Sequence, residues 1–457
     1  MKTKSNTLLT AGIALALLLS AGCASQGSPV SGGQSGAAAG TAPENKAAEE
    51  KTTIVVWGGV PEESGPGDVI RAFEALHPEI KVEYYRYVND EQGNLKLDTA
   101  LLADDDIDLY YSYSDSLAVT RIERGVAEDL TPWLEKAGFD MTENYGEGYA
   151  THNGKVYGLP DSLSNIVIYL NKDMFDEAGI PIPEEWTIEE YREIAAKLTG
   201  TRNGQHVFGG MMDWMDTASF LLHVPLLGPD SFYKEDGTSN FDHPIFRTSL
   251  EFLQNLMVKD KSHVSLIEYQ TSQLTLYGEF LNGRTAMMSA GLSLSRYIKD
   301  RNTYPHDFVT AFAPFPLVEA GKPNYGWKGL SNVIMMNKNS RNKEAAFQFL
   351  LFAGTEGQIY YAKAGKLPSW KKIDKDKVMA EILGPDAEEI FDLESFERVV
   401  LNPKSKFFFN TKFTAYPQII KIWQEEVEKV LGGQQDIDRA LLQAKERADQ
   451  VIRAASQ

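Results

Sequence analysis

The chain has 457 residues, of which 43% are hydrophobic and 11% aromatic, and its formal net charge is −19. A chain of this length exceeds one ordinary hydrophobic core, so we expect two domains. The excess of acidic residues argues against binding to nucleic acid or to anionic lipid, because both carry negative charge.

A short leader opens the sequence. Lys2 and Lys4 form a positive region, and residues 8–19 are apolar apart from one threonine. This run has the length of a secretory signal core and is too short to cross the hydrocarbon region of a bilayer, about 30 Å thick. Small residues then lead to Cys23, the only cysteine of the chain. The arrangement resembles a bacterial lipobox, in which residues 1–22 are removed and the cysteine carries lipid.

The segment after this cysteine, residues 23–52, is rich in Gly, Ser, Ala, Gln and Pro. It cannot bury enough apolar surface to fold, so we expect a flexible tether. The alternative interpretation is an ordinary secretory signal with an incidental cysteine. No later run of 18 apolar residues occurs, so the sequence predicts no transmembrane helix.

Strands and helices alternate in the part that follows. Residues 53–57 form a β-branched run, 69–76 have helical spacing of apolar residues, and 80–84 alternate as a second strand. Residues 95–102 favour another helix, and 107–111 a third strand. This order predicts a mostly parallel α/β sheet, whose carboxyl edge is the usual place for a ligand.

Similar elements continue to the end of the chain. Residues 156–160 and 167–170 are strand-like, and Thr187 begins a helix through a capping box with the glutamate three residues later. An apolar stripe over 419–430 predicts a helix, and 437–451 continue as another.

Several motifs in this order and spacing form a specific pattern. They are F-E-A-L-H-P-E-I-K-V at 73–82, D-I-D-L-Y at 106–110, Y-G-L-P at 157–160, Y-L-N-K-D-M-F at 169–175 and F-L-N-G-R-T-A-M at 280–287. The chain therefore resembles the family 1 extracellular solute-binding proteins, the sugar-type receptors of ABC importers that include maltose-binding protein. The resemblance runs from about Ile54 to about Ala448, and one departure is Asp106, where the family usually has proline.

The resemblance implies an α/β fold with two lobes, of the type II periplasmic-binding-protein kind. Each lobe would be a mostly parallel sheet flanked by helices, with a hinge cleft between them. The first lobe would take 53–161 and 307–355, and the second 162–306 and 356–457. The implied function is capture of a carbohydrate, with an oligosaccharide favoured, and its delivery to the permease subunits of an ABC transporter.

A sugar site needs flat aromatic faces for the C–H face of the ring and polar groups for its hydroxyls. Residues of these kinds follow predicted strands or lie at expected crossings between the lobes. In the first lobe and the crossing they are Trp57, Ser114, Asp115, Asp161, Ser164 and Asn165. In the second lobe and the later crossing they are Asp213, Trp214, Gly291, Ser293, Trp327 and Tyr416.

Structural explanations compete with these assignments. Trp57 is equally well explained as a core tryptophan, and Asp115 as the N-cap of the helix that begins near residue 117. Asp161 and its neighbours at 164–165 also suit a turn. The family often has tryptophan just after Gly291, where this chain has leucine, and Trp327 could instead pack on the surface.

Two other functions remain open at the level of sequence. A surface-anchored carbohydrate hydrolase would need a carboxylate pair, but none stands out among the 64 acidic residues. A sensor for a membrane kinase would bind the same solute as a transport receptor. Histidine spacing indicates no metal site, and the aspartates at 104–108 lack the glycine and glutamate of an EF-hand. We expect a monomer with no cofactor, held by its lipid at the extracellular face of a cell membrane, which favours a Gram-positive source.

Overall fold

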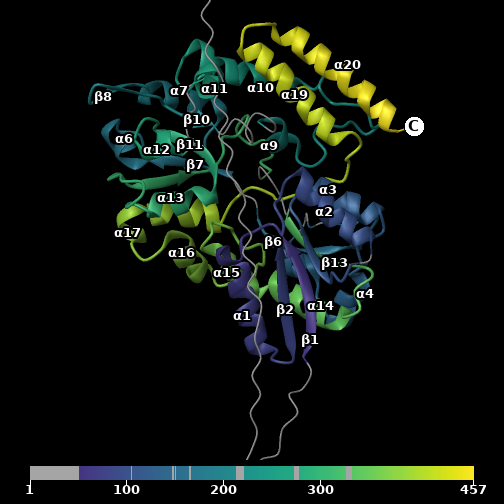
Figure 1. Cartoon of the computed structure of the whole chain (residues 1–457). Helices are drawn as coiled ribbons and strands as arrows, with labels where there is room; N and C mark the ends of the chain where they lie inside the picture. The colour runs from purple at the N-terminus through teal and green to yellow at the C-terminus, as the bar shows by residue number, and fades with distance from the viewer. Residues whose placement is uncertain are drawn as a thin grey trace, which may run out of the picture. The chain divides into compact units, whose positions relative to one another are not determined.

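The structure, a computed structural model, describes residues 51–103, 105–146, 149, 151–163, 166–212, 221–271, 277–325 and 332–456. Residues Glu49–Gln457 form one compact unit that contains two larger β-sheets with their helices (Figure 1). Across the described ranges, no helix combines the length and apolar character that a membrane span requires. We call the parts around these two sheets the first lobe and the second lobe.

The first sheet is built from β1 (Thr52–Gly58), β2 (Ile80–Arg86), β3 (Leu109–Ser112), β6 (Gly158–Ser162) and β13 (Asn332–Met336). Their order is β2-β1-β3-β13-β6. β1 pairs in parallel with β2 and β3, whereas β13 lies antiparallel between β3 and β6. The carboxyl ends of β1, β3 and β6 therefore lie at one edge of the sheet.

Helices cover both faces of the first sheet. Alternate residues of its strands point to opposite sides, so each face contributes side chains to an apolar core of its own. Leu109 and Ile334 belong to one apolar core, and Tyr110 and Val333 belong to another. The first core includes residues of α1 (Pro66–Leu76), α4 (Thr131–Ala137), α5 (Met141–Tyr145), α14 (Lys343–Gly354) and α15 (Ile359–Ala362). The second includes residues of α2 (Glu91–Leu102) and α3 (Asp115–Glu123).

The second sheet has the order β10-β11-β7-β12. Its strands are β7 (Ile166–Asn171), β10 (Met211–Met212), β11 (Met287–Gly291) and β12 (Thr310–Ala313). Only β10 and β11 pair in parallel, so this sheet is mixed, and the expectation of a mostly parallel sheet is wrong here. β7 begins where β11 ends, with Ile166 opposite Gly291, and is therefore antiparallel to β11. It is also antiparallel to β12, its other neighbour.

Helices of the second lobe surround this sheet and form an aromatic core next to it. Those that precede β12 are α6 (Lys172–Glu177), α7 (Ile188–Leu198), α9 (His223–Leu227), α10 (Pro244–Gln254), α11 (Leu266–Thr271), α12 (Gly278–Leu281) and α13 (Ser295–Lys299). Those that follow are α16 (Lys375–Leu383), α17 (Ala387–Ile390), α18 (Leu393–Phe396), α19 (Tyr416–Leu431) and α20 (Ile437–Ala455). The last two pack against each other and on α10 (Figure 1).

Short elements complete the described chain. Two hairpins are formed by β4 (Thr151–His152) with β5 (Lys155–Val156) and by β8 (Gly200–Arg202) with β9 (Gln205–Val207). Single turns of 3-10 helix are η1 (Glu62–Ser64), η3 (Leu292–Leu294) and η4 (Glu356–Gln358). Two π-helical turns, η2 (Asn255–Lys259) and η5 (Glu397–Leu401), follow α10 and α18.

The lobe boundaries differ from the expected ones at two places. β12 pairs with β7 in the second sheet, so the chain enters the first lobe only after residue 313 and not at 307. Tyr361 in α15 is buried in the first-lobe core, so that lobe extends beyond residue 355. Both differences follow from side-chain burial and strand pairing, which the sequence motifs do not report.

Candidate functional site

The first group of candidate residues lies after β3, at the carboxyl edge of the first sheet. Ser114 is the N-cap of α3, and its hydroxyl accepts a hydrogen bond from the Leu117 amide at 3.2 Å. Capping therefore belongs to Ser114 and not to Asp115. The Asp115 carboxylate instead accepts hydrogen bonds from the backbone amide and the side-chain amide of Asn410, at 3.2 and 3.3 Å.

Asn410 connects the two lobes through its side chain. It lies in the segment between η5 and α19, and its Oδ1 accepts a hydrogen bond from the Asp230 amide at 2.9 Å. The Asp230 carboxylate in turn accepts from the backbone amides of Thr411 and Lys412, at 2.7 and 2.9 Å. A chain of carboxylate and amide groups thus runs from α3 of the first lobe to the loop after α9 of the second. We call Asp115, Asn410 and Asp230 the cross-lobe triad.

Tyrosines lie beside the cross-lobe triad on the second-lobe side. Tyr416, the first residue of α19, packs edge-on against Phe413 with ring centroids 5.5 Å apart. Burial raises the pKa of its hydroxyl well above the ordinary value, and the negative charge of Asp115 adds to the effect. Tyr233 donates a hydrogen bond to the Thr414 carbonyl at 3.0 Å. Asp115 and Tyr416, predicted from distant parts of the sequence, are therefore brought together.

The second group surrounds Asp161, which lies on β6 and is only 1% exposed. Its carboxylate accepts hydrogen bonds from the Ser162 hydroxyl at 2.6 Å and from the Lys366 ammonium at 2.8 Å. The same ammonium lies 4.9 Å from the ring centroid of Tyr361 and 5.8 Å from that of Tyr113. Cation–π attraction therefore adds to the ion pair.

Further hydrogen bonds fix the rings of this group. The Tyr113 hydroxyl accepts from the Gly59 amide at 2.8 Å. The hydroxyls of Tyr111 and Tyr361 lie 3.0 Å apart, and burial raises the pKa of both far above the ordinary value. Both phenols are protonated at neutral pH and can donate hydrogen bonds. We call Tyr111, Tyr113 and Tyr361 the tyrosine cage.

Gly291 and Ser293 lie where β11 ends in the second sheet. The Gly291 carbonyl accepts a hydrogen bond from the Tyr169 hydroxyl at 3.2 Å, and the Ser293 hydroxyl lies 3.5 Å from that of Tyr277. The turn that carries Lys366 approaches them closely. A Cβ atom on Gly365 would lie 2.6 Å from the Leu292 carbonyl oxygen. This turn thus joins the second group to two more predicted residues.

Trp57 packs against the same apolar core as Tyr113 but forms its own ring contacts. Its ring stacks on Tyr85, with centroids 6.2 Å apart, and the Lys96 ammonium lies 5.6 Å from its centroid. It lines a shallow hollow along α2 together with Leu95 and Thr99. The remaining predicted residues lie outside the described part of the chain: Cys23, Ser164, Asn165, Asp213, Trp214 and Trp327.

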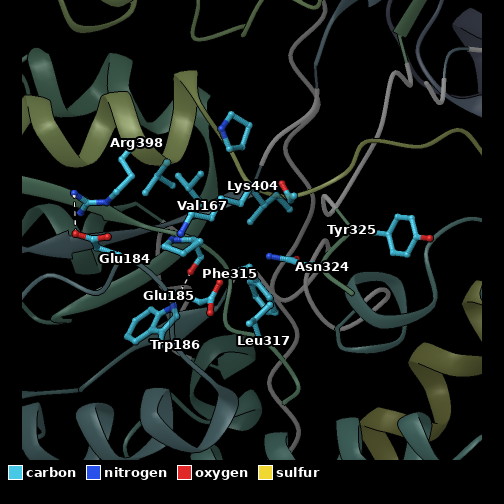
Figure 2. Close-up of a pocket in the computed structure, with 15 residues that line it drawn as sticks. Val167, Glu184, Glu185, Trp186, Phe315, Leu317, Asn324, Tyr325, Arg398 and Lys404 are labelled. Atoms are coloured by element: carbon cyan, nitrogen blue, oxygen red, sulfur yellow. Dashed lines mark hydrogen bonds and ion pairs between the residues drawn. The ribbon is translucent and has the colours of Figure 1, made fainter. Parts of the chain in front are cut away.

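A separate small pocket lies beside the chain segments that connect the lobes (Figure 2). It has a volume of about 50 Å³. Figure 2 shows Arg398 facing Glu184 at one end and Tyr325 at the other. The Arg398 guanidinium lies 3.9 Å from the Glu184 carboxylate. The Trp186 indole donates to the Pro314 carbonyl at 2.7 Å. None of the predicted site residues lines this pocket. Within the described ranges, no three His, Cys, Asp or Glu side chains gather in a way that would hold a metal ion.

Sequence reasoning missed Asn410, Asp230 and Lys366. Asn410 lies in an irregular segment without periodicity, and Lys366 lies on a turn after a four-residue helix. Asp230 has a positive φ of 56°, which places it in a turn but does not reveal its partner. The one signal available was chemical, because amides and carboxylates in loops are common at binding sites.

Comparison with known proteins gives a family. The family described as bacterial extracellular solute-binding protein matches residues 59–359. Among individual relatives, the sn-glycerol-3-phosphate-binding periplasmic protein UgpB of Escherichia coli is 24% identical over 426 residues. That alignment covers 89% of this chain and 94% of the relative.

Solved structures share the fold. A sugar transporter of Rhizobium etli in an open conformation matches with a TM-score of 0.73 at 21% identity, covering 88% of this chain and 99% of the other. An ABC substrate-binding protein of Listeria monocytogenes in complex with cycloalternan matches with a TM-score of 0.65 at 24% identity, with coverage of 88% and 99%. These likenesses confirm the predicted two-lobe α/β fold.

Proposed function

The chain belongs to the family of bacterial extracellular solute-binding proteins, and we propose that it captures a carbohydrate between its two lobes and delivers it to an ABC importer. Relatives with this fold are named as a sugar transporter and as a protein in complex with cycloalternan. The lobes close on the solute by a hinge motion, and binding requires no covalent chemistry.

The cross-lobe triad is the observation that carries this proposal. Asp115 on the first lobe and Asp230 on the second meet through Asn410, with bonds between 2.9 and 3.3 Å. Carboxylate and amide groups are suited to the hydroxyls of a sugar, and the ring of Tyr416 beside them offers an aromatic face. A solute held here would contact both lobes at once and therefore favour the closed form.

The other predicted residues extend this site in the proposal. Ser114 supports Asp115, while Asp161 and Ser293 lie on either side of the turn at residues 363–367. Trp214 and Trp327 are proposed as further aromatic platforms, with Asp213, Ser164 and Asn165 as polar partners, on sequence grounds alone. A Cβ atom on Gly291 would meet nothing nearer than the Ser293 hydroxyl at 4.0 Å, so the space beside this glycine is open. In the proposal the solute approaches through this space.

Calorimetry with a panel of mono-, di- and oligosaccharides and glycerol 3-phosphate tests this function. We expect a saccharide to bind and to raise the melting temperature, since a ligand of the native state stabilises it by RT ln(1 + [L]/Kd). Asp115→Asn should weaken that binding by about tenfold or more, equivalent to about 1.4 kcal/mol. Asp376→Asn, also in the first turn of a helix, is the matched control and should bind as the wild type.

Two outcomes would contradict the proposal. If no saccharide of the panel binds, the carbohydrate assignment is refuted. If glycerol 3-phosphate alone binds, the solute is a glycerophosphate and not a carbohydrate. Conversion of a bound saccharide into product would instead support a hydrolase.

We also propose that Cys23 carries lipid and holds the protein at the extracellular face of a cell membrane. The support is the sequence alone: a positive start, a short apolar run, small residues and the only cysteine. In this arrangement the tether over 23–52 lets the folded part reach its permease.

A further inference from the structure

The turn at residues 363–367 is one of the places where the chain passes between the lobes. Tyr361, just before it, is buried in the first-lobe core, whereas Ala362 and Leu367 belong to the core next to the second sheet. α15 packs on both α1 and α16 (Figure 1). Any rotation of one lobe against the other therefore has to be accommodated around this turn.

Two chain crossings are hydrogen-bonded to each other at this point. The Leu163 amide, just after β6, donates to the Leu367 carbonyl at 2.7 Å, and the two residues form an isolated β-bridge. Asp161 and Lys366 precede these two residues and form their ion pair directly beside the bridge. The ion pair thus lies at the place where two of the crossings run side by side.

Adjacent residues of the turn are attached to opposite lobes. Gly365, with φ of +76°, lies so close to Leu292 and Ser293 of the second lobe that a Cβ atom would be 2.6 to 2.8 Å from their backbone. Lys366 reaches the other way, to Asp161 on β6. The backbone at Gly365 is thus held against the second lobe, while the side chain of the next residue is held by the first lobe.

We propose that Lys366 is a positioning residue of the binding protein: its ion pair with Asp161 holds the crossing to the first lobe and so limits how far the lobes separate. Asp161 is 1% exposed and Lys366 20%, so water and salt screen the pair weakly. The tyrosine cage keeps the ammonium in place from the sides, with ring centroids 4.9 and 5.8 Å away. The expected effect on solute affinity rests on the proposed function, whereas the expected effect on the separation of the lobes does not.

The test compares distances between the lobes with and without the ion pair. The double variant Lys366→Met with Asp161→Asn removes both charges together, because one buried charge left alone would destabilise the fold. Spin labels on cysteines at the exposed positions Lys136 and Glu446, in a Cys23→Ser background, report the distance by double electron–electron resonance. We expect the solute-free distance distribution to broaden towards larger separation.

A matched control lies three residues away on the same segment. Lys363 pairs with Asp68 of α1 and lies before Gly365, the residue held against the second lobe, whereas Lys366 lies after it, beside the bridge of Leu163 with Leu367. Lys363→Met with Asp68→Asn should therefore leave the distance distribution unchanged. Lys366→Arg is a milder second variant, whose guanidinium keeps a positive charge opposite Asp161, and it should broaden the distribution less than the double variant.

The affinity for the solute gives an independent readout. A larger population of open molecules lowers the binding-competent fraction, so we expect the double variant to bind about three to ten times more weakly. An unchanged distance distribution in both Lys366 variants would overturn the proposal. Weaker binding with an unchanged distribution would also overturn it and would assign the ion pair of Lys366 with Asp161 to direct contact with the solute. Because the distance measurement needs no ligand, a failed saccharide screen leaves this result standing.

Discussion

At the scale of single residues, buried histidines illustrate how packing sets charge. His223 lies in the second-lobe core, with its ring centroid 4.7 Å from that of Phe246. Burial lowers its pKa from 6.5 to about 3, because the apolar surroundings penalise the charged form. Among the described residues neither ring nitrogen has a hydrogen-bond partner. The histidine is therefore neutral in the folded protein at pH values well above 3.

This neutrality predicts a loss of stability in acid. Below pH 6.5 the unfolded chain binds a proton at His223 and the folded chain does not, so the free energy of unfolding falls as pH decreases. The slope from this residue is at most about 1.4 kcal/mol per pH unit. His223→Leu should remove that contribution, which denaturant titrations over roughly pH 7 to 4 can measure. The same substitution at the exposed His206 is the control. Parallel stability curves for the wild type and His223→Leu would contradict the prediction.

The same scale explains what sequence could say about the site. The position of Ser114 and Asp115 at the carboxyl edge of the sheet was predictable, because both follow a buried strand. Their separate roles were not, since either can cap a helix, and only the bond from the Leu117 amide decides for Ser114. Asn410 could not be found, because its partner Asp115 lies 295 positions earlier and no local pattern links them.

At the scale of elements, local signals predicted helices better than sheet pairing. The helix that begins after Thr187 was predicted from its capping box, and both reciprocal hydrogen bonds are present. The helices α19, from its apolar stripe, and α20, as its continuation, were also predicted, and the two pack against each other. The strand β12 was assigned to the wrong lobe, because pairing with β7 depends on residues far away in the sequence.

The capping box of α7 leads to a prediction at this scale. The Thr187 hydroxyl accepts from the Glu190 amide at 3.3 Å, and the Glu190 carboxylate accepts from the Thr187 amide at 2.7 Å. Thr187→Ala should lower the free energy of unfolding by about 1 kcal/mol. Thr248→Ala is the control, because that hydroxyl only bonds a carbonyl of its own helix. Equal stability of the two variants in denaturant titrations would show that the cap contributes nothing.

At the scale of the whole molecule, the negative net charge and the proposed lipid have opposite effects on attachment to a membrane. The net charge of −19 opposes adsorption to anionic headgroups, so attachment to a membrane would depend on the lipid alone. The sequence motifs predicted two lobes, and the fold comparisons confirm them. The sequence did not locate the residues at which the chain crosses between the lobes. These crossings are defined by the core in which each side chain is buried, and sequence motifs do not report burial.

The proposed anchor predicts where the protein is found. Cys23→Ala should release it into the medium, because a single substitution removes the lipidated residue. Fractionation of cells expressing each form, with antibody detection, measures this. Solute affinity should not change, since Cys23 lies outside the folded unit of residues 49–457. Retention of the variant in the membrane fraction would contradict the lipid assignment.

The central position of β13 has a consequence for the order in which the chain can fold. β3 and β6 have no direct pairing with each other in the first sheet and are joined only through β13. The ribosome delivers β13 after β7, β10, β11 and β12, so the strand edges of β3 and β6 stay open until most of the second lobe has been synthesised. Contacts of such long sequence separation form slowly. Late completion of the first sheet therefore leaves the nascent polypeptide without its full set of strand pairs until β13 has been synthesised, which suits the proposed export of the chain before it folds.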